Sequence, residues 1–265
     1  MALTMKVPVA AAILAFFPLS IWAQTTITLE PSQDTALFSE PGSDLSNGVG
    51  PHLYGGQTNQ GNNRRSLLAF DFSAIPAGST INEATLTLTL SLASPGSSSR
   101  TFNLHRVTGA WGEGTSDAGS PGGTGAPATA GDATWRERIF GTTSWANEGG
   151  DFIASASATT NVLSLLGPYD FTGLEADVNA WVSGSEVNNG WILIGEEDAP
   201  RTAMRFESRE NFTPTAVPSL SVTFTAPATG GGGGGGGDPT AVPGPGPVAL
   251  IILCLAVLLV SRRGF

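Results

Sequence analysis

The sequence predicts an all-β fold, a jelly-roll β-sandwich with one short helix, from three observations. Many short stretches place apolar residues at every second position, as in residues 66–72 and 84–92. Such alternation is typical of half-buried strands, since successive side chains leave opposite faces of the pleat. Turn residues separate these stretches at regular intervals, and only one segment has helical spacing. No repeat of about 20–50 residues is present, which excludes a propeller or solenoid.

The stretch from residue 62 to residue 92 carries the clearest signal. Its first half places Leu68, Phe70 and Phe72 on one side, and its second half alternates apolar residues, mostly leucine, with threonine or serine. Ile75-Pro76-Ala77-Gly78 between them has the composition of a turn. We therefore expect two strands of one antiparallel sheet, each with a single apolar face.

The other elements follow in chain order. Further strands are expected at residues 25–30, 34–39, 101–107, 191–195, 204–206 and 220–224. A helix is expected over residues 172–182, with Thr172 and Glu175 as a capping box and Gly184 as its stop. The long stretch 109–150 is rich in Gly, Ser and Thr, and its tryptophans indicate that much of it packs on the sandwich.

The two ends differ from the body in composition. Residues 1–23 contain one lysine and an apolar run, which predicts a secretory signal peptide. Residues 229–246 form a Gly/Pro-rich linker, and residues 247–265 an apolar segment followed by two arginines. We expect this tail to act as a C-terminal transmembrane anchor, with the β-sandwich domain (residues 24–228) outside the membrane and the C-terminus cytoplasmic. The protein is thus expected to be exported and anchored at the cell surface.

Charge and cysteine content narrow the possible partners. Residues 24–228 contain 21 acidic residues, nine arginines and no lysine, which disfavours nucleic acid as a partner. The single cysteine, Cys254, lies in the apolar tail, so the domain has no disulfide.

Motifs for catalysis are missing from the sequence. There is no G-x-S-x-G, no HExxH and no phosphate-binding glycine loop, and His52 and His105 are the only histidines. We therefore expect a protein that is not an enzyme. The alternative of a polysaccharide hydrolase or lyase depends on paired carboxylates, for which Glu196-Glu197-Asp198 is the best cluster.

Aromatic and acidic loop residues are the candidate ligand-binding groups. Tyr54, Trp111, Trp135 and Trp145 lie in predicted loops, where an exposed ring could stack on a sugar. The alternative is that these rings anchor the loops on the core. For a metal, Asp34, Asp44 and Asn47 are the candidate ligands, with Ca²⁺ as the expected cation because it prefers several oxygen ligands.

Several ordered motifs carry a resemblance to a known family. They are RRSLLAFDFSAIPAGSTINEATLTL (residues 64–88), LHRVTGAWGEGT (104–115), GDATWRER (131–138), SWANEGGDF (144–152) and FESREN (206–211). With these motifs the body resembles the DNRLRE-type domain of exported proteins, similar to disaggregatase-associated and CBM96-like carbohydrate-binding modules. The resemblance implies a jelly-roll sandwich without a known catalytic centre, which in some relatives binds polysaccharide.

The tail resembles the sorting signals of PEP-CTERM proteins, although Val242-Pro243-Gly244-Pro245 lacks the usual glutamate. This resemblance implies processing by a C-terminal sorting protease. Taken together, we expect a non-catalytic cell-surface module that binds polysaccharide or extracellular matrix. The alternative is a structural or adhesive surface protein with no small ligand.

Overall fold

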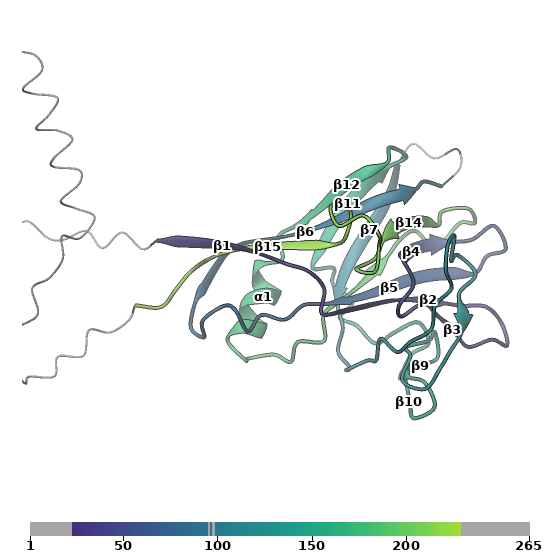
Figure 1. Ribbon diagram of the computed structural model, residues 1–265, viewed down its shortest axis with the longest axis horizontal. Helices are drawn as coiled ribbons and strands as arrows, with labels where there is room; N and C mark the ends of the chain where they lie inside the picture. The colour runs from purple at the N-terminus through teal and green to yellow at the C-terminus, as the bar shows by residue number, and fades with distance from the viewer. Residues whose placement is uncertain (1–22, 95, 97–98, 229–265) are drawn as a thin grey trace, which may run out of the picture. The chain divides into compact units, whose positions relative to one another are not determined.

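The computed structural model describes residues 23–94, 96 and 99–228. These residues form an all-β, sandwich-like fold with one short helix, as the sequence predicts (Figure 1). The elements are β1 (Gln24–Leu29), β2 (Gln33–Phe38), β3 (Leu45–Ser46), β4 (His52–Gln57), β5 (Asn63–Ala69), β6 (Thr80–Leu92), β7 (Ser99–Arg106), β8 (Ala126–Pro127), β9 (Glu137–Ile139), β10 (Thr143–Ser144), β11 (Ala158–Leu163), β12 (Gly167–Thr172), α1 (Glu175–Val182), β13 (Trp191–Ile194), β14 (Met204–Glu207) and β15 (Ser219–Thr225).

The strands form two layers that are joined through one strand. In the first layer β6 is the central strand, paired with β12, β14 and β15, and β1 adds to β15. The second layer has the order β2–β5–β13–β7–β11. Strand β4 pairs with β14 through residues 52–55 and with β5 through residues 56–57, so it connects the two layers.

Residues 62–92 contain two antiparallel strands, β5 and β6, as predicted, but these two strands do not pair with each other. β5 pairs with β2, β4 and β13, whereas β6 pairs with β12, β14 and β15. The connection between β5 and β6 carries the chain from one layer to the other, and its Phe70, Phe72 and Ile75 are buried in the shared core. These apolar residues favour a crossing through the core over a tight surface hairpin.

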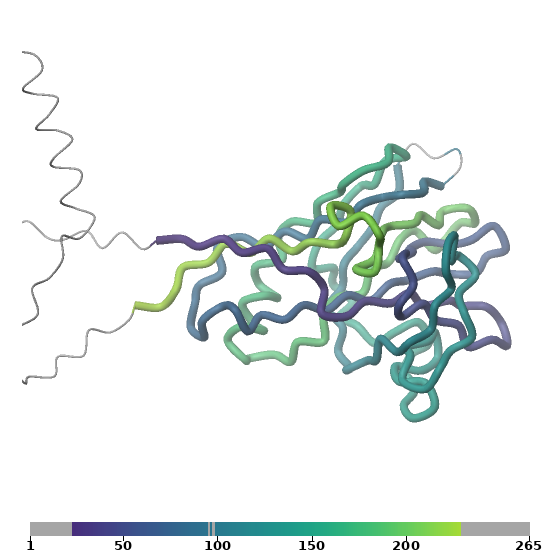
Figure 2. The backbone as a smooth tube through the Cα atoms, viewed as in Figure 1, coloured from purple at the N-terminus to yellow at the C-terminus, as the bar shows by residue number. Residues whose placement is uncertain are grey.

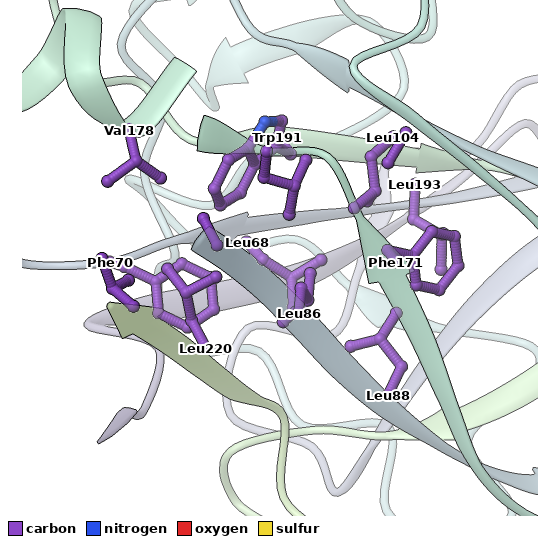
Figure 3. Close-up of a cluster of buried hydrophobic side chains, with 14 of the residues drawn as sticks. Leu68, Phe70, Leu86, Leu88, Leu104, Phe171, Val178, Trp191, Leu193 and Leu220 are labelled. Atoms are coloured by element: carbon purple, nitrogen blue, oxygen red, sulfur yellow. The ribbon is translucent and has the colours of Figure 1, made fainter. Parts of the chain in front are cut away.

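The main core lies between the layers and follows the predicted period of two. Along β6, Ala84, Leu86 and Leu88 are fully buried while the threonines between them are half-buried. Figure 3 shows Leu86 and Leu88 of the first layer with Leu68, Leu104 and Trp191 of the second in this cluster. The alternation ends at Leu92, which is 54% exposed.

Strand β5 departs from the prediction of a single apolar face. Leu68 contributes to the main core, but Leu67 and Ala69 on the opposite side are buried as well. They belong to a second apolar cluster on the outside of the second layer, which we call the outer cluster (Leu37, Leu67, Ala69, Val107, Trp111, Ala133, Trp145 and Ile192). The segment between β7 and β11 supplies its cover.

The helix forms as predicted but begins differently. Its N-cap is Leu174, without a side-chain cap, and the predicted capping box of Thr172 and Glu175 does not form. The carboxylate of Glu175 instead accepts a hydrogen bond from the Ala84 amide of β6 at 3.1 Å, which ties the helix to the first layer. The helix ends before Gly184, whose φ of +72° is the left-handed conformation that glycine adopts without strain.

The predicted signal peptide, linker and anchor lie almost wholly outside the described residues and remain predictions. Within the described part of the chain, no helix is long and apolar enough to span a membrane. The apolar clusters all fall between residues 27 and 224, so a fragment of residues 24–228 contains the complete core of the domain.

Candidate functional site

The long segment between β7 and β11 packs on the outer face of the second layer. Figure 2 shows this segment in teal beside the purple and blue strands near the N-terminus. Short strands organise it: β9 pairs with β10, and β8 pairs with β3. The apolar faces of Leu67, Ala69 and Ile192 need cover from water, and the tryptophans of the segment provide it.

Three of the four predicted ligand-binding rings are interior. Trp111 and Trp145 are 5% and 6% exposed, and their indole N–H groups donate to the carbonyls of Asn189 (2.9 Å) and Thr134 (3.0 Å). Tyr54 is 6% exposed and its hydroxyl donates to the Pro121 carbonyl. Burial raises the pKa of Tyr54 to about 12. The expectation of exposed stacking rings is therefore wrong for these three residues, and they anchor the loops instead.

Trp135 is the ring that stays partly exposed. The guanidinium of Arg65 lies over it, 4.8 Å from the ring centroid. Arg65 also forms a two-point ion pair with Glu197, both contacts being 2.7 Å, and donates to the Gly149 carbonyl at 2.8 Å. These contacts hold Trp135 at the protein surface. There it lines a depression together with residues 39–43, Arg136 and Glu148.

Three adjoining depressions run along this surface and share lining residues. The largest, about 570 Å³, includes Arg138, Trp145 and Asp151. The second, about 320 Å³, shares Ser144 and Trp145 with the first. The third, about 240 Å³, is the one beside Trp135, and it shares Arg136 and Glu148 with the second. We call these three depressions together the loop groove.

The polar groups of the loop groove have both signs of charge. Arg136 and Asp44 form an ion pair at 2.7 Å, and the hydrogen bond from this carboxylate raises the pKa of Arg136. Asp151 is partly desolvated, but hydrogen bonds from the backbone amides of Ala146 and Asn147 hold its pKa below the usual range. The groove thus presents fixed donors and acceptors beside small patches of apolar surface, which suits a ligand with many hydroxyl groups.

Each of the predicted metal ligands contacts other residues of the protein. Asp44 pairs with Arg136, and Asn47 joins two loops by donating to the His52 carbonyl and accepting from the Ala118 amide, each at 2.9 Å. Asp34 is fully buried, and its neighbouring carboxylates are Glu113 and Glu210. The set of Asp34, Asp44 and Asn47 therefore stays a prediction, and two of its members have other partners in the structure.

Two carboxylates of the acidic cluster weighed for a hydrolase, Glu196 and Glu197, are held in ion pairs. Glu196 accepts from Arg100 at 2.9 Å, and Glu197 accepts from Arg65 at 2.7 Å. Both carboxylates hold the strand end of β13 against neighbouring elements, so they serve the fold.

Residues that sequence reasoning missed lie in the groove and beside Asp34. Arg136, Arg138, Glu148 and Asp151 lie in two of the motifs that carry the family resemblance, but nothing in those motifs marked them as ligand-binding residues. Glu113 did carry a signal, since glycines flank it on both sides. Glycines on both sides of a residue in a long loop indicate that the backbone there packs closely against another segment, here residues 131 and 132.

Comparison with protein families finds a match for the first part of this domain. Residues 25–117 match the model of carbohydrate-binding module family 96. The match spans β1 to β7 and the start of the long segment, including Trp111 and Glu113. This match supports a CBM96-like domain, and the motifs of residues 64–88 and 104–115 lie within it. A search of curated proteins finds no match for this chain.

Proposed function

We propose that the protein is a non-catalytic module that binds polysaccharide in the loop groove. The observation that carries this proposal is the match of residues 25–117 to a carbohydrate-binding family. That match favours a carbohydrate ligand but does not say where it lies. The loop groove supports a location for the ligand, because its three depressions adjoin one another through shared lining residues and could accommodate successive sugars of a polymer.

The chemistry of the groove supports this location. Arg138 and Asp151 line the largest depression, and Arg136 and Glu148 line both of the others. Guanidinium groups donate and carboxylates accept, so together they can bind the hydroxyls of successive sugars. Trp135 supplies the aromatic surface at one end, and stacking a sugar on such a ring removes apolar area from water at about 25 cal/mol per Å².

A glycan array with the fragment of residues 24–228 tests the proposal. It should include neutral and uronic-acid polysaccharides, because the groove contains both arginines and carboxylates. We expect binding to at least one polymer, weakened about fivefold to thirtyfold by Glu148→Ala or Trp135→Ala, which corresponds to about 1–2 kcal/mol. Glu83→Ala is the matched control, since Glu83 is exposed on β6 and does not line the groove.

Two different results would contradict the proposal, and each rejects a different part of it. No binding to any polymer by a folded fragment would favour the alternative of a structural or adhesive surface protein. Binding that Glu83→Ala and the groove variants leave equally intact would retain the carbohydrate function and reject the loop groove as its place.

The location of the protein is part of the same proposal. Residues 1–23 would direct export, and the jelly-roll domain would then lie outside the membrane. Residues 247–265 would serve as an anchor that a sorting protease recognises. Both features are consistent with a surface module. Deleting residues 243–265 should release a folded domain, because the core ends at Phe224. Retention of that truncated protein in the membrane fraction would contradict the anchor.

A further inference from the structure

Three carboxylates from distant parts of the chain meet beside the long segment. Asp34 belongs to β2, Glu113 follows Trp111, and Glu210 follows β14. Each offers an oxygen atom within 4.8 Å of the others. That spacing fits ligands of one shared Ca²⁺ ion, whose bonds to oxygen are roughly 2.3–2.6 Å long.

Two oxygens of this group lack a partner among the described residues. Asp34 is 0% exposed, and its Oδ2 accepts from the Arg209 amide at 2.9 Å while its Oδ1 accepts nothing. Glu210 has the same asymmetry: one oxygen binds the Arg209 side chain at 2.8 Å and the buried Oε2 is unpaired. Buried carboxylate oxygens without donors are costly, because the protein must replace the water that they lose.

The protein charges around the group do not balance. Arg209 is the cation that contacts it, through a two-point ion pair with Glu113 and a contact to Glu210. Three carboxylates and one guanidinium leave an excess of two negative charges. Burial, together with the charges of Glu210 and Glu113, raises the pKa of Asp34 well above its usual range. A divalent cation would remove this excess and satisfy both unpaired oxygens.

The backbone holds Glu113 firmly in place. Gly112 and Gly114 flank it, and a Cβ on Gly112 would lie 2.0 Å from the Gly131 carbonyl oxygen. A Cβ on Gly114 would meet the Asp132 carboxylate at 1.5 Å, and its φ of +72° also favours glycine. The carboxylate of Glu113 in turn accepts the Asp34 amide at 2.8 Å. Two of the three acidic groups are therefore fixed relative to each other by the fold.

From these contacts we propose that Asp34, Glu113 and Glu210 bind a divalent cation, Ca²⁺, which ties β2, the long segment and the end of β14 together. The donors are all oxygen, which favours a hard cation over zinc or copper. They come from three separate segments, and Ca²⁺ tolerates such irregular geometry better than Mg²⁺, which requires a near-ideal octahedron. The proposal does not depend on the polysaccharide function.

Calorimetric titration of Ca²⁺ into the EGTA-treated fragment of residues 24–228 tests the site. We expect one Ca²⁺ per chain, tighter than Mg²⁺ at the same site, and a melting temperature that Ca²⁺ raises and EGTA lowers. Asp34→Asn and Glu210→Gln keep the side-chain shape but remove one charge each, and should weaken Ca²⁺ binding by about tenfold or more. Glu83→Gln, which removes an exposed charge elsewhere, should bind as the parent does.

Two results would overturn the proposal. One is no Ca²⁺ binding at millimolar concentration with a melting temperature that EGTA does not change, which would indicate a protonated Asp34 in place of a cation. The other is Ca²⁺ binding that both Asp34→Asn and Glu210→Gln retain at full affinity. If Asp34→Asn does not fold, Glu210→Gln decides alone, because Glu210 is only partly buried.

Discussion

The two apolar clusters on opposite faces of the second layer are built in different ways. The main core is made mostly of strand side chains that alternate with half-buried polar residues, as along β6. The outer cluster joins strand residues to loop tryptophans, and each of those tryptophans also needs a hydrogen bond from its indole N–H. The side chains of the main core are thus held mostly by burial, whereas the long segment combines burial with hydrogen bonds from its tryptophan side chains to backbone carbonyls.

The largest expected effect is in the main core. Leu88→Asp places a carboxylate at a fully buried position between the layers, and should cost about 5 kcal/mol or more, comparable to the whole stability of a domain. Leu92→Asp in the same strand is the matched control, since Leu92 is 54% exposed. Circular dichroism and thermal melting should show an unfolded Leu88→Asp and a folded Leu92→Asp; equal melting of both would contradict the assigned register.

A smaller effect is expected in the outer cluster. Trp145→Ala removes a buried ring and the donor to the Thr134 carbonyl, and should cost about 3 kcal/mol. Hydrogen exchange should then show increased opening of residues 109–150 while amides of β6 stay protected. Trp145→Phe, which keeps most of the ring, should cost less. Uniform loss of protection across both layers would show that the two clusters are not separable.

The ionic contacts of Arg65, which lies over the Trp135 ring, should contribute less to the free energy of unfolding than either cluster does. Arg65→Ala removes the two-point ion pair to Glu197 and the contact to the Gly149 carbonyl, and should cost about 2 kcal/mol. Arg65→Lys keeps a charge but not the two-point geometry, so it should recover only part of that stability. Urea unfolding gives the comparison, and a full recovery by lysine would contradict the geometric argument.

The features that could be predicted from the sequence differ from those that could not in a similar way: local strand patterns were predictable, and contacts between distant segments were not. The strand faces of β6 followed from periodicity, because a strand alternates by itself whatever its partners are. The partners of β5 and the grouping of Asp34 with Glu113 and Glu210 did not. These depend on which segments meet across long separations in the chain, and no local pattern encodes that.

The smallest effect concerns pH. His52 is buried beside Glu207, with Nδ1 2.8 Å from its carboxylate; burial, with Arg205, lowers the pKa of His52 from its ordinary value of 6.5. A lowered folded-state pKa means that the unfolded chain binds the proton more readily. Its stabilising contribution is therefore present above pH 6.5 and is lost as the pH falls through the folded-state value. His52→Gln should reduce this part of the pH dependence of the melting temperature, and an unchanged profile would contradict it.

The most direct test of the account is a hydrogen-exchange footprint of the polysaccharide that the array identifies. The central claim is that the ligand lies on the loop groove above the outer cluster. Saturating ligand should slow the exchange of amides in residues 108–110 and 135–151, with little change along β6 and β12. Protection centred on β6 and β12, with residues 135–151 unaffected, would contradict the claim.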